Sequence, residues 1–252
     1  MPVNFFPDTD VLLTYLNQSS EYHKNAIKLM EATKKGAIDG IIVVGVSQEF
    51  KSIISHFDGA FDFIRMDAEN WKKTQKGFRE YRRHIQKLMK DKSILPSRKI
   101  PLDMILFKTE NQKYFDVAQI NKFLEEIQLE FSERIKEINE IFEIQDSSMK
   151  RFNVNQAIAI NKIFYNKKAF PIKKSKDIKD NTHLVSATLC CVRLEKLQKE
   201  GWFVTIDNFR SNQKWYQRDD ISKKIFDELS VNLRIHKLNH FAEKVIGLEN
   251  KF

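Results

Sequence analysis

Four acidic residues of this 252-residue chain stand where carboxylates could act together. Three follow short apolar runs and one begins an amphipathic helix: Asp8, Glu49, Asp207 and Asp180. Hydrolysis of a phosphodiester bond needs an activated water and neutralisation of the charge on the transition state, and hard divalent cations held by carboxylates supply both. Four acids with no cysteine and no paired histidine beside them favour Mg²⁺ or Mn²⁺ over zinc.

The apolar runs read as strands of a parallel sheet that would position these carboxylates. Residues 3–6 lead into Asp8 and a helix near 11–16, and residues 202–206 deliver the last acid at their carboxyl end. Residues 40–46 are apolar on both faces, as in a central parallel strand, and a helix at 47–57 would place Glu49 in its first turn. Because sites of α/β proteins lie outside the carboxyl ends of parallel strands, we expect the acids to meet there.

Each acid also has an ordinary structural reading. Asp8 and Glu49 could be helix caps or first-turn acids favoured by the helix macrodipole, and Asp207 could be a turn residue. Asp177 lies one turn before Asp180 and competes with it as a ligand. His183, one turn further into the same helix, is expected to support the site or to lie on the surface rather than to bind a metal.

The order of four short motifs resembles the PIN-domain family of nucleases. The motifs are DTDVLLTYL, VSQEF, D-x-x-H-L-V-S-A and FVTID, and the resemblance covers residues 1–58 and roughly 165–245. In that family four acidic positions surround one or two divalent metals, and the matching positions here are Asp8, Glu49, Asp180 and Asp207. The resemblance implies further site roles for Thr205 and Asp10, and Asp177 stays an alternative ligand.

The resemblance also implies a fold. We expect a single PIN-like domain over 1–252, of the three-layer α/β/α class with a central parallel sheet, and a mainly helical insertion over 59–165. Hydrophobic periodicity predicts insertion helices at 67–92 and 115–144. Residues 100–107, near Pro96 and Pro101, read as a strand or an extended connection.

The distribution of charge points to a polyanionic partner. The chain carries a formal net charge of +9, and its basic residues cluster in 71–99 and in 150–179 on either side of an acidic helix. We expect a nucleic acid, RNA before DNA, to be held by basic side chains next to the third acid and on the insertion helix: Lys167, Lys168, Lys173, Lys174, Lys176, Lys179, Arg82 and Arg83. The alternative is an ordinary solvated basic loop.

These features predict a metal-dependent endoribonuclease, acting as a toxin with an antitoxin partner or as a defence effector. A DNA or flap-type nuclease of the same fold and a non-catalytic nucleic-acid-binding protein are the alternatives. The sequence has no apolar run of membrane-spanning length and no secretory signal, so we expect no membrane partner and a cytoplasmic location. The adjacent cysteines Cys190 and Cys191 are expected to be small buried hydrophobic residues.

Overall fold

A sheet of five parallel strands lies at the centre of one part of the protein in the computed structural model, which describes residues 3–74, 76–112, 114–145, 154–164, 175–193, 200–206 and 216–247. The strands are β1 (Val3–Pro7), β2 (Ile38–Val43), β3 (Glu143–Gln145), β4 (Glu200–Thr205) and β5 (Asn232–Lys237). Their order across the sheet is β3-β2-β1-β4-β5, and each neighbouring pair is parallel. The predicted α/β class with a central parallel sheet is confirmed.

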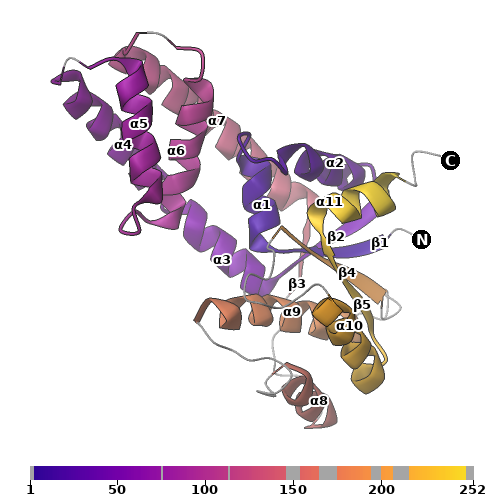
Figure 1. The fold of residues 1–252 in the computed structure, drawn as a ribbon. Coiled ribbons are helices and arrows are strands. Elements are labelled where there is room, and N and C mark those ends of the chain that lie inside the picture. Colours follow the sequence, from indigo (N-terminus) through magenta and orange to yellow (C-terminus); the bar gives the residue numbers. More distant parts are fainter. Residues whose placement is uncertain are drawn as a thin grey trace. The chain divides into compact units, whose positions relative to one another are not determined.

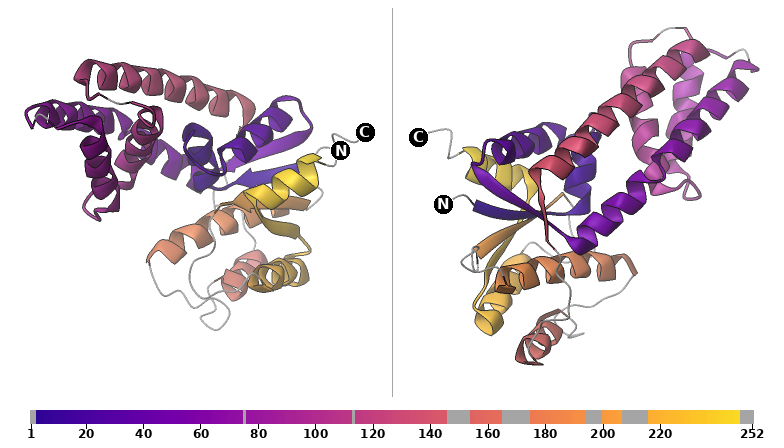
Figure 2. Two further views of the ribbon diagram at one scale, coloured as in Figure 1. Left: turned by 45° about the horizontal axis from the view of Figure 1, so that its top comes forward. Right: turned by 180° about the vertical axis from the view of Figure 1, so that it is seen from behind.

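Helices cover both faces of this sheet. They are α2 (His23–Lys34), α8 (Val154–Phe164), α9 (Ser175–Arg193), α10 (Tyr216–Leu229), α11 (Leu238–Phe241) and a π-helical turn (Ala242–Ile246). Figures 1 and 2 show α2 and α11 on one side of the sheet and α9 and α10 on the other. The arrangement is the three-layer α/β/α type.

The first strand, β1, lies in the middle of the sheet, and later strands are added first on one side of it and then on the other. Strands β2 and β3 are added on one side of β1, whereas β4 and β5 are added on the other. In open parallel sheets of this kind, the carboxyl ends of the strands where the side changes leave room for a ligand. The fold therefore marks the ends of β1 and β4 as a place for a site.

Close packing against β1 explains why residue 201 is a glycine. A Cβ atom on Gly201 would lie 2.6 Å from the ring of Phe6 and 2.9 Å from Sγ of Cys191, distances at which no side chain fits. Gly201 lies inside β4, where it lets β1 and α9 approach. Phe5, the neighbouring core residue, packs its ring against Phe142 and Phe241.

A second compact unit comprises residues 13–23 and 50–137 and is helical. It contains α4 (Phe57–Lys72), α5 (Phe78–Lys90), α6 (Pro96–Lys108) and most of α7 (Val117–Ile141). Helices α1 (Thr9–Leu16) and α3 (Val44–Ile54) begin in the α/β unit and end in this one. The expected helical insertion at 59–165 falls partly within these limits, and its status as an insertion in one domain stays a prediction.

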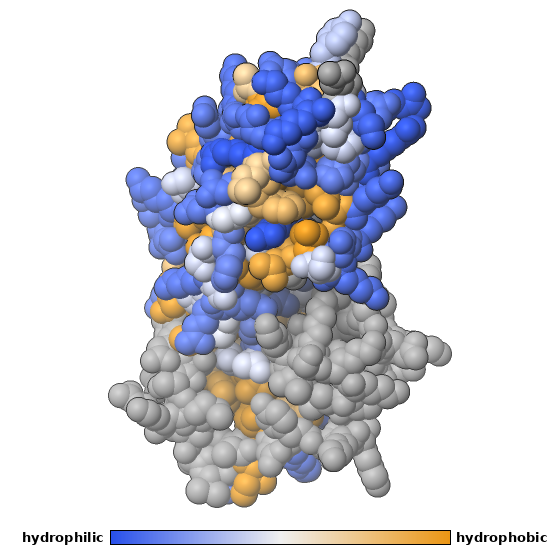
Figure 3. Space-filling view, turned by 90° about the vertical axis from the view of Figure 1, so that its left-hand side faces the viewer, coloured by the Kyte–Doolittle hydropathy of each residue, from blue (hydrophilic) through white to orange (hydrophobic). Residues whose placement is uncertain are grey.

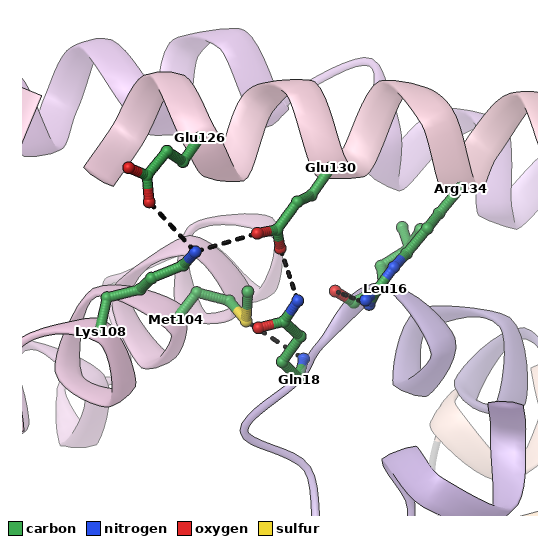
Figure 4. A network of polar contacts seen from close by, with 7 residues as sticks. All are labelled: Leu16, Gln18, Met104, Lys108, Glu126, Glu130 and Arg134. Atoms are coloured by element: carbon green, nitrogen blue, oxygen red, sulfur yellow. Dashed lines mark hydrogen bonds and ion pairs between the residues drawn. The ribbon is translucent and has the colours of Figure 1, made fainter. Parts of the chain in front are cut away.

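Polar contacts join α7 to α6 and to the segment after α1 (Figure 4). Lys108 Nζ lies 2.9 Å from Glu130 Oε1 and 3.3 Å from Glu126 Oε2. The other oxygen of Glu130 accepts a 2.6 Å hydrogen bond from the amide nitrogen of Gln18. The guanidinium of Arg134 donates to the carbonyl oxygen of Leu16 at 3.3 Å. We call this group the α7 seam.

Two predictions about the helical unit are wrong. The single helix expected at 67–92 is parts of two helices, because the chain turns after Lys72 and α5 starts at Phe78, after the extended backbone of its N-cap Gly77. The segment 100–107 is neither a strand nor an extended connection but most of α6. Pro101 removes one intrahelical hydrogen bond there, and the complete burial of Leu102 and Ile105 offsets that loss.

None of the helices in the described part of the chain is both long enough and apolar enough to cross a lipid bilayer. Cys190 and Cys191 are free and buried in α9, as expected. Burial raises the pKa of the Cys191 thiol well above its ordinary value, so it stays an uncharged core group.

Candidate active site

Asp8 is held at the end of β1 by the backbone on both sides of it. Its N–H donates to the carbonyl oxygen of Val204 in β4 at 2.8 Å, and its carbonyl oxygen accepts the N–H of Val11 at 3.1 Å in the first turn of α1. Its Oδ1 accepts the N–H of Thr9 at 2.8 Å. Asp8 thus does serve the start of a helix, as its ordinary reading proposed.

The same carboxylate also meets a histidine from a distant part of the chain. Nδ1 of His183, in α9, lies 2.8 Å from Asp8 Oδ1, and the imidazole is 5% exposed. On its other side, Nε2 lies 3.4 Å from Glu49 Oε2, and Thr9 Oγ1 donates to that oxygen at 2.9 Å. Asp8 and Glu49 therefore converge on one buried imidazole.

Glu49 reaches this position from a helix that starts earlier than the sequence suggested. Strand β2 ends at Val43 and α3 begins at Val44, so Glu49 lies in the second turn of the helix instead of the first. The apolar run that reads as a strand to residue 46 therefore contains the start of α3. A Cβ atom on Gly45 would lie 3.2 Å from the His183 ring, so this glycine lets α3 pass close to the histidine.

A third carboxylate, that of Asp10, accepts hydrogen bonds from residues at the carboxyl end of β4. Its Oδ2 accepts a 3.0 Å hydrogen bond from Thr205 Oγ1 and a 3.2 Å hydrogen bond from the N–H of Ile206. Thr205 is 1% exposed. The resemblance implied site roles for Asp10 and Thr205. Their contact lies where β1 and its neighbour β4 end, and β2 is the neighbour of β1 on the other side.

His183 was expected to support the site or to lie on the surface, and its contacts with two carboxylates agree with the supporting role. The signal was available, since the histidine follows Asp180 by three positions and such residues share a face of a helix. Its burial and its two carboxylate contacts depended on where α9 packs, which the sequence alone did not show. With its two ring nitrogens facing the two carboxylates, the buried imidazole restricts the orientation of both acids.

Several predicted site residues lie outside the described residues. This holds for Asp207, Lys167, Lys168, Lys173 and Lys174, and for the side chains of Asp177, Asp180, Lys176 and Lys179 within the described backbone of α9. Of the two predicted substrate-binding arginines, Arg82 is half-buried and donates from Nη1 to the carbonyl oxygen of Glu110 at 2.9 Å, whereas Arg83 is exposed.

The described donor atoms suit a hard cation in kind. Asp8, Asp10 and Glu49 offer carboxylate oxygens, the ligands that Mg²⁺ and Mn²⁺ take. Within the described part of the chain, Asp8 Oδ2 accepts no hydrogen bond, so this oxygen is not committed to holding the fold. The described residues include no group of three or more His, Cys, Asp or Glu side chains placed to hold a metal, so a complete site needs ligands beyond them.

Comparison with known proteins adds no relative: no protein-family model, no curated protein and no solved structure matches this chain.

Proposed function

We propose that this protein is a metal-dependent nuclease of the PIN-like type that hydrolyses phosphodiester bonds in RNA. The observation that carries the proposal is the convergence of Asp8 and Glu49 on buried His183 at the carboxyl ends of parallel strands. Carboxylates gathered at that edge repel one another, and a cation relieves the repulsion. A fold alone does not imply a function, so the proposal rests on this group of side chains.

The cation would be held by Asp8 and Glu49, together with Asp180 and Asp207 as the resemblance implies. When bound, Mg²⁺ or Mn²⁺ would activate water and neutralise charge on the phosphate. The chain itself orients the ligands. Thr9 and His183 fix the Glu49 carboxylate, His183 and the Thr9 N–H fix that of Asp8, and Thr205 fixes Asp10.

The test is cleavage of labelled RNA and DNA with Mn²⁺, with Mg²⁺ and with EDTA. We expect RNA to be cut only when a metal is present, and Asp8→Asn and Asp207→Asn each to lower the rate at least about 100-fold, since even residues that only support metal ligands cost 10- to 100-fold. Asp39→Asn is the matched control, because Asp39 is exposed and lies near the amino end of β2.

Two results would contradict the proposal: full activity in EDTA, or wild-type rates in both site variants. Cleavage of DNA but not of RNA would support the nuclease activity but would favour the alternative, a DNA or flap-type nuclease. A role as a toxin or defence effector predicts that cells expressing the wild type grow poorly and that cells expressing Asp8→Asn grow normally.

A further inference from the structure

Helix α5 presents a row of cations to solvent. The row consists of exposed residues three or four positions apart, which share one side of a helix: Arg79, Arg83, Lys87 and Lys90. The opposite side of α5 packs into the helical unit through Phe78, Tyr81 and Ile85, each at most 1% exposed. At about 1.5 Å of rise per residue, the cation row is about 16 Å long.

No described acidic residue neutralises the cation row. None of its four side chains forms an ion pair or a hydrogen bond with another residue in the described part of the chain. Like charges at this spacing destabilise a helix. The macrodipole favours Lys87 and Lys90, which lie in the last turn, but disfavours Arg79 in the first turn, so the stability of α5 does not explain the whole row.

The exposed face of α7, in the same unit, shows what an ordinary solvated face looks like. There, acidic and basic residues are mixed: Lys122, Glu125, Glu133 and Lys136. Helix α5 carries a single acid, Glu80, among its basic residues. The single sign of the cation row is thus a feature of α5 and not of this unit's surface in general.

We propose that the cation row binds the phosphate backbone of a nucleic-acid strand. The inference deepens the proposed function, on which it rests for the identity of the strand as substrate. Guanidinium groups suit phosphate oxygens, and at about 3.4 Å of axial rise per phosphate in one strand of a duplex the row spans about five nucleotides. Contacts of this kind position a strand without reading its sequence.

A membrane surface fits this helix less well. Helices that lie on membranes bury a face of large apolar side chains in the lipid. Helix α5 buries Phe78, Tyr81 and Ile85 inside the unit and leaves Leu88 and Met89 half-buried. The exposed large hydrophobic residues of this unit lie in other segments: Met66, Leu95, Phe107, Tyr114 and Leu129. Figure 3 looks from the side on which Figure 1 draws α4 and α5, and hydrophilic residues surround a smaller hydrophobic group on that face.

The experiment compares two pairs of substitutions with the same change of charge. Arg83→Gln with Lys87→Gln removes the middle of the row, whereas Lys51→Gln with Lys122→Gln removes two exposed lysines of the same unit outside it. Both pairs are made in the full chain carrying Asp8→Asn, so that the probe is not cut. Affinity for a short single-stranded RNA and for a DNA duplex is measured from about 50 to about 200 mM salt.

We expect the row pair to lower the slope of log affinity against log salt by about 1.4 for the single strand and about 1.8 for the duplex. When the salt concentration is raised over that range, the fold-decrease in RNA affinity should be about sevenfold smaller for the row pair than for the parent protein. The control pair should keep the parent slope. Arg83→Gln alone, with about half the effect, serves if the pair does not fold.

An unchanged slope, or an equal loss in both pairs, would overturn the cation row as a nucleic-acid surface. Loss of binding to phosphatidylserine vesicles with RNA binding intact would assign it to membranes instead. Cleavage by the wild type separates this inference from the proposed function. If RNA is cut and the slope is unchanged, only the row fails; if RNA is not cut and the slope falls, only the nuclease fails.

Discussion

Charged residues are arranged in opposite ways in the two units. In the α7 seam of the helical unit, Lys108 lies between Glu126 and Glu130, and each of these two contacts pairs a positive with a negative charge. At the sheet edge of the α/β unit, the carboxylates of Asp8, Asp10 and Glu49 gather beside hydroxyl groups and one imidazole. The α7 seam thus pairs unlike charges, whereas the sheet edge gathers like charges, whose repulsion the proposed cation would relieve. Substitutions in the two places should therefore separate activity from stability.

Among residues that are not proposed metal ligands, the largest effect should follow loss of His183. We expect His183→Leu, which keeps the buried volume and removes both nitrogens, to reduce metal-dependent cleavage about 10- to 100-fold, because the orientation of Asp8 and Glu49 is lost. His183→Asn retains a donor near the position of Nδ1 and should recover part of the rate.

Metal titration of the rate separates positioning from a general loss of structure. A higher metal concentration for half-maximal rate in His183→Leu, with Asn intermediate, is the expected pattern. Equal rates for Leu and wild type would show that the two carboxylates need no histidine between them.

The seam should respond in the opposite way. Lys108→Met removes the charge and leaves Glu126 and Glu130 facing each other, so we expect it to lower the free energy of unfolding by about 1–2 kcal/mol, discounted for partial exposure. Urea denaturation measures this, and cleavage at a temperature where the variant is folded should be unchanged. Lys51→Met, on an exposed lysine, is the control and should stay within about 0.5 kcal/mol.

Asp8→Asn should affect activity and stability in the opposite way to Lys108→Met, with cleavage lost and the free energy of unfolding nearly unchanged. Asparagine can still accept the Thr9 N–H and is a favoured residue at a helix start, and the change removes one of the gathered charges. We expect the free energy of unfolding to change by no more than about 1 kcal/mol in either direction while cleavage is lost. A loss as large as that of Lys108→Met would mean that Asp8 serves the fold first.

The smallest effect is a dependence on pH in the helical unit. Burial lowers the pKa of His23 below its ordinary value, against the effect of its hydrogen bond to the Thr14 carbonyl oxygen. A lowered pKa in the folded state means that the stabilising contribution is present above the ordinary value, near 6.5, and is lost as the pH falls. Wild type should lose more stability than His23→Gln between about pH 7.5 and 5 in urea denaturation. Parallel losses would remove His23 as the cause.

Much of the fold followed from local pattern. The apolar runs at β1, β2 and β4 and the long amphipathic helix α7 are confirmed, because buried strands and one-sided helices leave a local pattern in the chain. Strand β3 has three residues, too few for a period, and it was not predicted. Helix α6 was misjudged because Pro101 suggests a break, whereas the burial of its apolar side outweighs one missing hydrogen bond.

The candidate site was predictable only in part. Asp8 and Glu49 could be found because each follows a strand, and strand ends meet at one edge of a parallel sheet. The contact of His183 with both depends on how α9 packs against the sheet, which arises from tertiary structure. The same holds for the contact of Asp10 with Thr205, which joins residues 195 positions apart.

The central place of β1 also determines when the site can exist during synthesis. Asp8 is made before β4, but β1 needs β4 as its partner on one side, and the pairing joins Phe6 to Phe203. At about 5 to 20 residues per second, a ribosome takes about 10 to 40 s to travel between them. During that interval the nascent chain carries Asp8 and Glu49 without β4, so the edge of the sheet that the proposed site needs is incomplete. The proposed activity would therefore arise only after β4 has been made.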